Sequence, residues 1–95
     1  MSYTMAMKFD WNAEKNKWLK DNRGITFDEI TSLIEQGYLK TVIIHPQKKN
    51  QKIFVIERDG YAYNIPFIES EKGICFLKTI YPSRASTRKY LRSAP

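Results

Sequence analysis

The sequence has 95 residues, of which 42% are hydrophobic, and a formal net charge of +6. This length supports one domain with one modest core, and it excludes a two-domain enzyme with a separate cofactor domain. No apolar run is long enough to span a bilayer, residues 1–7 lack the pattern of a secretion signal, and the single cysteine excludes an internal disulfide or a multi-thiolate metal site. We therefore expect a cytoplasmic protein that binds no metal and no membrane.

The first expected elements are a short strand and a helix. Residues 8–11 alternate polar and apolar side chains, which is typical of a strand. Asn12 is a good N-cap for a helix over about 13–21, and Gly24 can take the left-handed conformation that ends a helix. Trp18 lies at helical spacing from its apolar neighbours, so we expect it in the core.

A second helix follows directly. Thr26 and Glu29 have the spacing of a capping box, in which each side chain accepts a hydrogen bond from the backbone N–H of the other residue. An apolar stripe then runs along the helix and is formed by Phe27, Ile30, Leu33 and Ile34. Gly37 is the expected end of this helix.

The rest of the chain is rich in strand patterns. We expect four strands, over residues 38–45, 52–58, 61–68 and 74–81. Asp59 and Gly60 between the second and third of them are a strong signal for a two-residue hairpin turn. Pro66 indicates an edge position or a bulge, because proline cannot donate a hydrogen bond to a sheet.

These elements define a single domain over residues 8–91, closed by a short helix over about 84–91. The expected fold class is α+β, with two N-terminal helices and one C-terminal helix packed on a four-stranded antiparallel sheet. We expect residues 1–7 to be poorly ordered and residues 92–95 to form a frayed tail.

The positive charge is concentrated in the second half of the chain. Residues 1–47 hold six basic and six acidic side chains, whereas residues 48–95 hold ten basic and four acidic ones. This asymmetry favours an anionic partner, either nucleic acid or an acidic protein. A basic surface that only keeps a small domain soluble is the alternative.

Few side chains point to catalysis. His45, the only histidine, is a candidate general base for RNA cleavage, or simply a half-exposed residue at a strand end. Cys75 lies in an apolar run and is expected to be buried and inert. Tyr61 and Tyr63 share one face of a strand, where they either stack on bases or pack in the core.

Residues 79–90 form the segment with the most candidate binding residues. Ser83 is placed to cap the last helix, where nearby backbone N–H groups would face an anion. Arg84 and Arg88 are four residues apart, so both can lie on one helical face and clamp a phosphate. A solvated terminal helix is the alternative.

Three stretches together resemble the BrnT toxin family of bacterial type II toxin–antitoxin systems. The first is FDWNAEKN (9–16), continuing to RGITFDE (23–29), the second is QKIFV (51–55), and the third runs from Ile80 to Lys89. In the third stretch, Arg84 and Thr87 match the family's arginine and threonine, and Ser86 takes the place of an alanine. The resemblance covers residues 8–91 in the expected order.

This resemblance implies a RelE-like fold and a toxin that cleaves RNA, arrests growth and needs no metal or other cofactor. It also implies a cognate antitoxin, usually with a ribbon-helix-helix DNA-binding part, which neutralises the toxin and carries the complex to its operator DNA. In such nucleases the 2′-hydroxyl of the RNA attacks the neighbouring phosphate, and basic side chains stabilise the charge that develops there.

The resemblance also assigns roles to residues. Arg84 matches the family position of a phosphate clamp, Lys52 stands where relatives usually have an arginine, and Arg23 replaces a histidine. The general base stays open among Glu57, His45 and Tyr81. The expected contacts to RNA phosphates are Arg88, Lys89, Arg58, Ser83 and Tyr81. Two other functions stay open: an inactive partner-binding module or corepressor of the same fold, and a small RNA-binding protein.

Overall fold

The computed structural model describes residues 7–48 and 50–91. Its elements are β1 (Lys8–Trp11), α1 (Ala13–Arg23), α2 (Phe27–Glu35), β2 (Leu39–Ile44), β3 (Gln51–Arg58), β4 (Tyr61–Glu69), β5 (Ile74–Leu77), β6 (Tyr81–Pro82), α3 (Arg84–Ser86) and the π-helical turn η1 (Thr87–Leu91). The predicted frayed tail and nearly all of the predicted disordered N-terminus lie outside the described residues. Met7, the first described residue, packs against the core.

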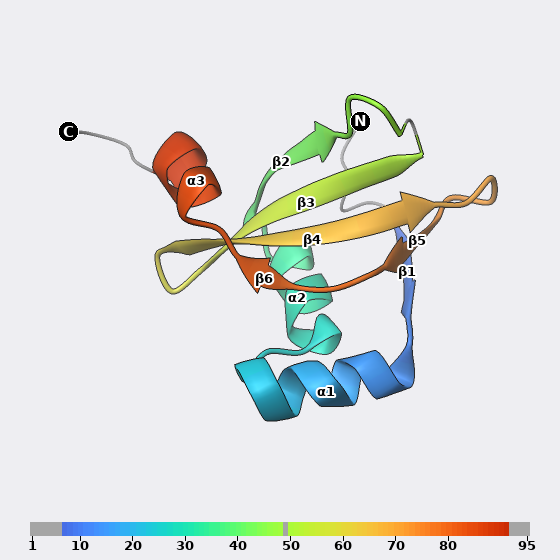
Figure 1. The fold of residues 1–95 in the computed structure, drawn as a ribbon, viewed down its shortest axis with the longest axis horizontal. Coiled ribbons are helices and arrows are strands. Elements are labelled where there is room, and N and C mark those ends of the chain that lie inside the picture. Colours follow the sequence, from blue (N-terminus) through green and yellow to red (C-terminus); the bar gives the residue numbers. More distant parts are fainter. Residues whose placement is uncertain (1–6, 49, 92–95) are drawn as a thin grey trace.

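The strands form one mixed sheet with the order β1-β5-β4-β3-β2, and β6 pairs with β4 (Figure 1). The antiparallel run from β2 to β5 and the α+β class confirm the prediction. The predicted strand count is wrong, because β1 joins the edge of the sheet parallel to β5 and β6 adds a short piece. A parallel pair needs a long connection between its strands, which here is most of the chain.

The fourth predicted strand is interrupted. Phe67 pairs with Leu77, and Asn64 pairs with Tyr81, so two residues of β4 face three residues of the neighbouring segment. Pro66 lies at this point of an inner strand, and its carbonyl accepts a hydrogen bond of 2.8 Å from the backbone N–H of Lys78. Of the two positions predicted for Pro66, the edge of the sheet is therefore wrong and the bulge is confirmed. The Pro66 nitrogen carries no hydrogen, and it faces the irregular stretch, where the sheet has no regular backbone hydrogen bond for this residue to donate.

The helix caps follow the sequence closely. The side chain of Asn12 accepts a 2.9 Å hydrogen bond from the Lys15 N–H, and Gly24 ends α1 with φ of 67°. Thr26 Oγ1 accepts from the Glu29 N–H at 3.1 Å. The second half of the capping box differs from the prediction, because the Glu29 carboxylate pairs with Arg58 at 2.6 Å instead. A tertiary ion pair thus replaces a local bond.

Replacing Thr26 with alanine is expected to lower the free energy of unfolding by about 1 kcal/mol, because the Glu29 N–H loses its acceptor. Urea unfolding followed by circular dichroism measures the change. Thr31→Ala is the matched control, since Thr31 lies inside the same helix, where alanine is the better helix former. Equal losses in the two variants would contradict the capping role of Thr26.

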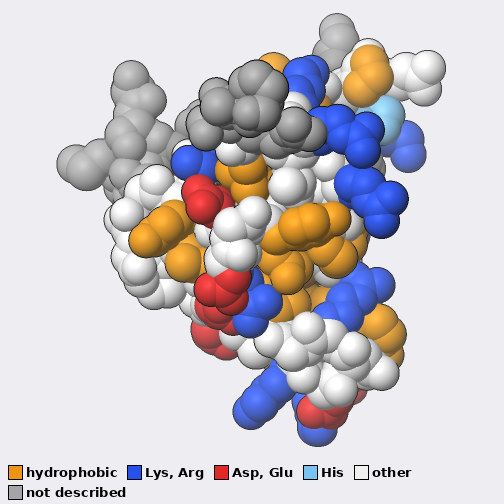
Figure 2. All heavy atoms as spheres, turned by 90° about the vertical axis from the view of Figure 1, so that its left-hand side faces the viewer, with side chains coloured by type: hydrophobic (Ala, Val, Ile, Leu, Met, Phe, Trp, Pro, Cys, Tyr) orange, Lys and Arg blue, Asp and Glu red, His pale blue; other side chains and the backbone are white. Residues whose placement is uncertain are grey.

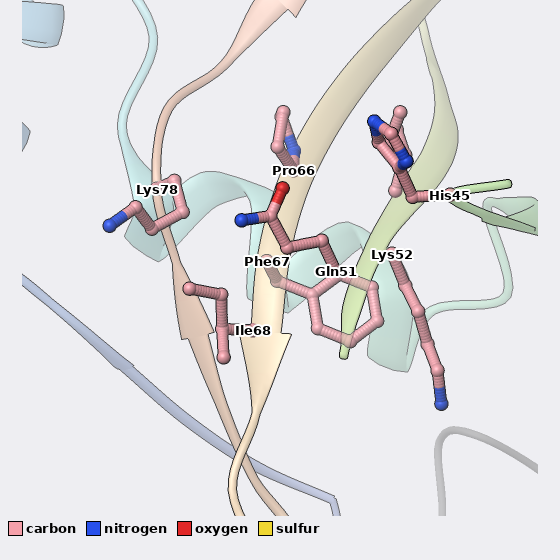
Figure 3. Close-up of a pocket in the computed structure, with 8 residues that line it drawn as sticks. His45, Gln51, Lys52, Pro66, Phe67, Ile68 and Lys78 are labelled. Carbon is pink, nitrogen blue, oxygen red and sulfur yellow. The ribbon is translucent and has the colours of Figure 1, made fainter. Parts of the chain in front are cut away.

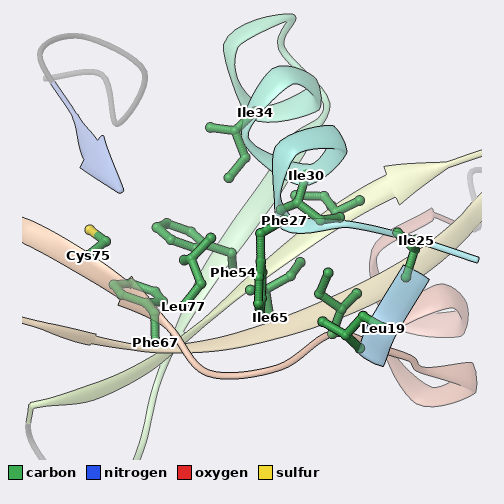
Figure 4. Packing of buried hydrophobic residues seen from close by; sticks show 12 residues of the cluster. Leu19, Ile25, Phe27, Ile30, Ile34, Phe54, Ile65, Phe67, Cys75 and Leu77 are labelled. Atoms are coloured by element: carbon green, nitrogen blue, oxygen red, sulfur yellow. The ribbon is translucent and has the colours of Figure 1, made fainter. Parts of the chain in front are cut away.

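The core lies between α1, α2 and one face of the sheet (Figure 4). The rings of Phe54 and Phe67 stack with centroids 3.8 Å apart, and Phe9 meets Phe54 edge-on. The Trp11 ring packs against the Phe27 ring, and the two ring centroids are 5.6 Å apart. The prediction that Trp18 lies in the core is wrong, because this residue is 43% exposed on the outer surface of α1. The only fully buried residue of that helix is its neighbour Leu19.

Cys75 belongs to this core and is 2% exposed, which confirms the expectation of burial. Burial raises the pKa of its thiol to about 11, and the negative charge of Glu69 adds to the shift. The folded protein thus holds Cys75 as a neutral thiol throughout the physiological pH range.

The raised pKa predicts a specific pH dependence. Above pH 9.0, the ordinary pKa of the thiol, the unfolded chain loses this proton while the folded chain keeps it until about pH 11. The Cys75 contribution to stability is therefore present below pH 9 and lost as the pH rises through this window. Urea unfolding between pH 8 and pH 11 should show a steeper loss for the unaltered protein than for Cys75→Ala. Parallel pH curves would contradict the prediction.

Candidate functional site

The C-terminal helix is fastened to β4 next to the β3–β4 hairpin. The Ser83 N–H donates to the Ala62 carbonyl at 2.9 Å, and the Ala62 N–H donates to Thr87 Oγ1 at 2.8 Å. Thr87 Oγ1 in turn donates to the Ser83 carbonyl at 2.8 Å. Figure 1 shows α3 beside the hairpin end of the sheet, on the side away from α1 and α2. These bonds fix where the basic side chains of the helix point.

Three cations of this helix, Arg84, Arg88 and Lys89, are exposed. Within residues 7–48 and 50–91, no acidic side chain pairs with them. Lys89 lies over the ring of Tyr90 at 5.4 Å. We call these three residues the basic helix surface. Cations without carboxylate partners are available to bind an anion.

Ser83 caps α3 as predicted, because its Oγ accepts a 3.0 Å hydrogen bond from the Ser86 N–H. The α-helical part has only three residues before the π-helical turn. So short a helix contributes little dipole, and binding of an anion here depends on the basic side chains rather than on the helix start.

Arg58 lies at the same end of the sheet, but its guanidinium is already engaged. Nε donates to Glu29 at 2.6 Å, one terminal nitrogen donates to the Gly24 carbonyl at 3.2 Å, and the other reaches the Tyr63 hydroxyl at 3.4 Å. The hydrogen bond to Glu29 is the main reason why the pKa of Arg58 is raised. Arg58 therefore joins the hairpin to the turn between α1 and α2 and is poorly placed for RNA.

Two of the predicted general bases lie at the hairpin end of the sheet. Glu57, opposite Ala62 in the sheet, forms an ion pair of 3.2 Å with Lys40. Tyr81 is exposed next to Asn64, whose buried side-chain oxygen has no hydrogen-bond partner among the described residues. The Tyr61 ring is also exposed here. The structure thus brings Glu57 and Tyr81 to the same end of the sheet as α3.

The other predicted residues lie at the opposite end. Lys52 pairs with Phe67 in the sheet, five residues along β4 from Ala62, which corresponds to about 17 Å. The Lys52 ammonium is 3.0 Å from Glu69. His45 Nδ1 accepts from the backbone N–H groups of Gln47 and Lys48 at 3.1 and 3.2 Å, so Nε2 carries the proton of the neutral ring.

A pocket of about 290 Å³ opens beside these residues (Figure 3). Its walls are mainly apolar, from Ile53, Pro66 and Ile68, and Lys78 and His45 lie at its rim. The structure therefore keeps Lys52 and His45 together but separates them from Arg84. Of the four predicted catalytic residues, Arg84, Lys52, Glu57 and His45, only Glu57 lies at the same end of the sheet as Arg84.

One cluster of surface side chains is not predicted from the sequence. The Trp18 ring lies between Lys15, whose Nζ is 4.4 Å from the ring centroid, and Arg23, whose guanidinium carbon is 5.1 Å from it. Arg23 Nη1 donates a hydrogen bond to the Ile80 carbonyl, directly before Tyr81. The sequence shows Lys15 and Trp18 three residues apart on one helix, but helical spacing alone predicts a place in the core for Trp18.

The described ranges offer no group of three or more His, Cys, Asp or Glu side chains that could hold a metal ion. In the same part of the chain, the helices are too short and too polar to cross a membrane.

No family model matches the sequence, and no curated protein matches it either. The fold, however, is similar to that of a solved structure, the ribonuclease toxin BrnT of Brucella abortus. The TM-score is 0.61, the two chains are 14% identical, and the match covers 82% of this chain and 97% of the other. The chain therefore has a BrnT-like fold, which confirms the fold expected from the three sequence stretches.

Proposed function

We propose that this protein is a toxin of a type II toxin–antitoxin system and acts as a metal-independent ribonuclease. The observation that supports this best is the basic helix surface, which presents unpaired cations on a fold shared with a ribonuclease toxin. The proposed substrate is RNA, and the expected outcome in a bacterial cell is growth arrest.

In the proposed reaction the 2′-hydroxyl of one nucleotide attacks the adjacent phosphorus. A base takes the hydroxyl proton, the bond from phosphorus to the 5′-oxygen breaks, and that oxygen is protonated. The products are a 2′,3′-cyclic phosphate and a 5′-hydroxyl end. Arg84 stabilises the extra negative charge on the phosphorane-like transition state, because a guanidinium can bind two of its oxygens at once.

Glu57 and Tyr81 are the proposed base candidates at this end of the sheet. His45 is a weaker candidate, because its Nδ1 lone pair already accepts two backbone hydrogen bonds at the far end. Arg88 and Lys89 are proposed to bind phosphates beside the reacting one. The proposed partner is a cognate antitoxin of the ribbon-helix-helix type, and operator DNA would be contacted through that complex.

The direct test is incubation of the purified protein with single-stranded RNA in EDTA, followed by analysis of the new RNA ends. Cleavage that leaves 5′-hydroxyl and 2′,3′-cyclic phosphate ends is expected. Dependence of the cleavage on added Mg²⁺ would contradict the proposal. The absence of cleavage, with RNA binding retained, would favour the inactive partner-binding module, which the separation of Lys52 and His45 from Arg84 also favours.

A further inference from the structure

Trp18 is one of several large hydrophobic side chains exposed on this molecule, and it carries the largest ring among them. An indole is large and apolar, and leaving 43% of it in water forgoes part of the stabilisation that burial would give. The nearby Trp11, by contrast, packs against Phe27 and the core. Trp18 therefore contributes little to the core, and its place on the surface calls for another explanation.

Two cations flank the ring. Lys15 lies one helical turn before Trp18 and Arg23 lies five residues after it, so they approach the ring from opposite directions along the helix. Their roles differ, because the Arg23 guanidinium is held by the Ile80 carbonyl, whereas Lys15 has a flexible stem and lies over the ring. Lys15 can move from the ring to a phosphate, which would uncover the indole while Arg23 stays in place.

One hydrogen bond links this cluster to the chain segment that leads to the basic helix surface. The Ile80 carbonyl that holds Arg23 belongs to the segment leading through the exposed Tyr81 to Arg84. Figure 2 faces the left-hand side of Figure 1 and shows hydrophobic side chains near the centre, with Lys and Arg side chains on their right and Asp and Glu side chains on their left. Exposed rings alternating with cations are the pattern that binds a single strand, because bases stack on the rings and phosphates pair with the cations.

We propose that Trp18, with Lys15 and Arg23, is a stacking subsite for one unpaired base of a single-stranded RNA. The proposal rests on the proposed function in that the same strand would place its phosphates on the basic helix surface. A duplex cannot use this subsite, since its bases are already stacked on one another. The subsite thus selects single strands, whereas the cations alone would bind either form.

The test measures binding without cleavage. A fluorescent, 2′-O-methylated RNA strand lacks the attacking hydroxyl, so fluorescence anisotropy reports affinity alone. Trp18→Ala is expected to weaken binding of the single strand about tenfold and to leave binding of the same strand in a duplex unchanged. Trp18→Phe, which keeps an aromatic ring, should recover most of the loss. Ile44→Ala is the control, because Ile44 is a large apolar side chain that is 64% exposed and pairs with Lys52 at the end of the sheet opposite to α3.

Equal affinity of Trp18→Ala and the unaltered protein for the single strand would overturn the subsite, as would a protein that does not bind the strand at all. An equal loss for single strand and duplex would also overturn it, since that pattern reports charge or folding rather than stacking. The subsite and the nuclease can fail separately. If Trp18→Ala selectively loses single-strand binding and the unaltered protein cleaves no natural RNA, the subsite is supported and the nuclease is rejected. If the unaltered protein cleaves RNA and Trp18→Ala binds the single strand as well as it does, the nuclease is supported and the subsite is rejected.

Discussion

Replacing Arg84 with alanine is expected to lower the rate of RNA cleavage by about 100-fold, the effect of removing one preorganised donor that stabilises transition-state charge. The side chain is exposed and none of the described acidic residues pairs with it, so its loss should leave the fold intact. Arg84→Lys keeps the charge but not the paired N–H donors, and an intermediate rate is expected.

Cleavage of a labelled RNA under single-turnover conditions measures this effect, and growth after induction in a bacterial host reports it in cells. Lys72→Ala is the matched control, because Lys72 is an exposed cation in the β4–β5 turn, which follows the end of β4 opposite to Ala62, where the last helix is bonded. The two variants change the net charge equally. Equal rates for Arg84→Ala and Lys72→Ala would remove Arg84 from the reaction and leave only its contribution to net charge.

Replacing Phe54 with alanine is expected to cost about 3–5 kcal/mol of unfolding free energy, because a fully buried ring is removed and a cavity remains. The Phe54 ring stacks on Phe67 and meets Phe9 at its edge, so its loss loosens contacts among β1, β3 and β4 at once. For a domain of this size such a loss is a large part of the total stability.

Urea unfolding at 25 °C measures this loss as a shift of the midpoint. Ile44→Ala serves as the control, since Ile44 is an aliphatic side chain on β2 that is 64% exposed and should cost little when truncated. If Phe54→Ala unfolds at nearly the same urea concentration as Ile44→Ala, the stacked pair is not the centre of the core.

The features that the sequence predicted well are local. The caps at Asn12 and Thr26 depend on residues three positions apart, and the hairpin at Asp59-Gly60 depends on two adjacent residues that both adopt positive φ. Each of these features can be identified from a few neighbouring residues, because the residues that form it are close together in the sequence. The α+β class also follows from the order of such local patterns.

The features that the sequence did not predict join distant residues. The Glu29 side chain leaves its predicted local bond because Arg58, brought near by the fold, offers a charged partner. Periodicity placed Trp18 in the core, since the sequence does not show which side of α1 the sheet covers. The family resemblance grouped Lys52 with Arg84, and only the strand register and the bonds of the last helix to Ala62 show that the two residues lie near opposite ends of β4.

The parallel pairing of β1 with β5 has a consequence for synthesis of the protein. Residues 8–11 find their partner strand only at residues 74–77, so β1 leaves the ribosome long before the strand with which it pairs. A nascent chain that stops before residue 74 has Phe9 and Trp11 but no neighbouring strand on which to order them. The β1–β5 pair can therefore form only after residue 77 has been synthesised, and the α3 segment that carries Arg84 emerges after that point.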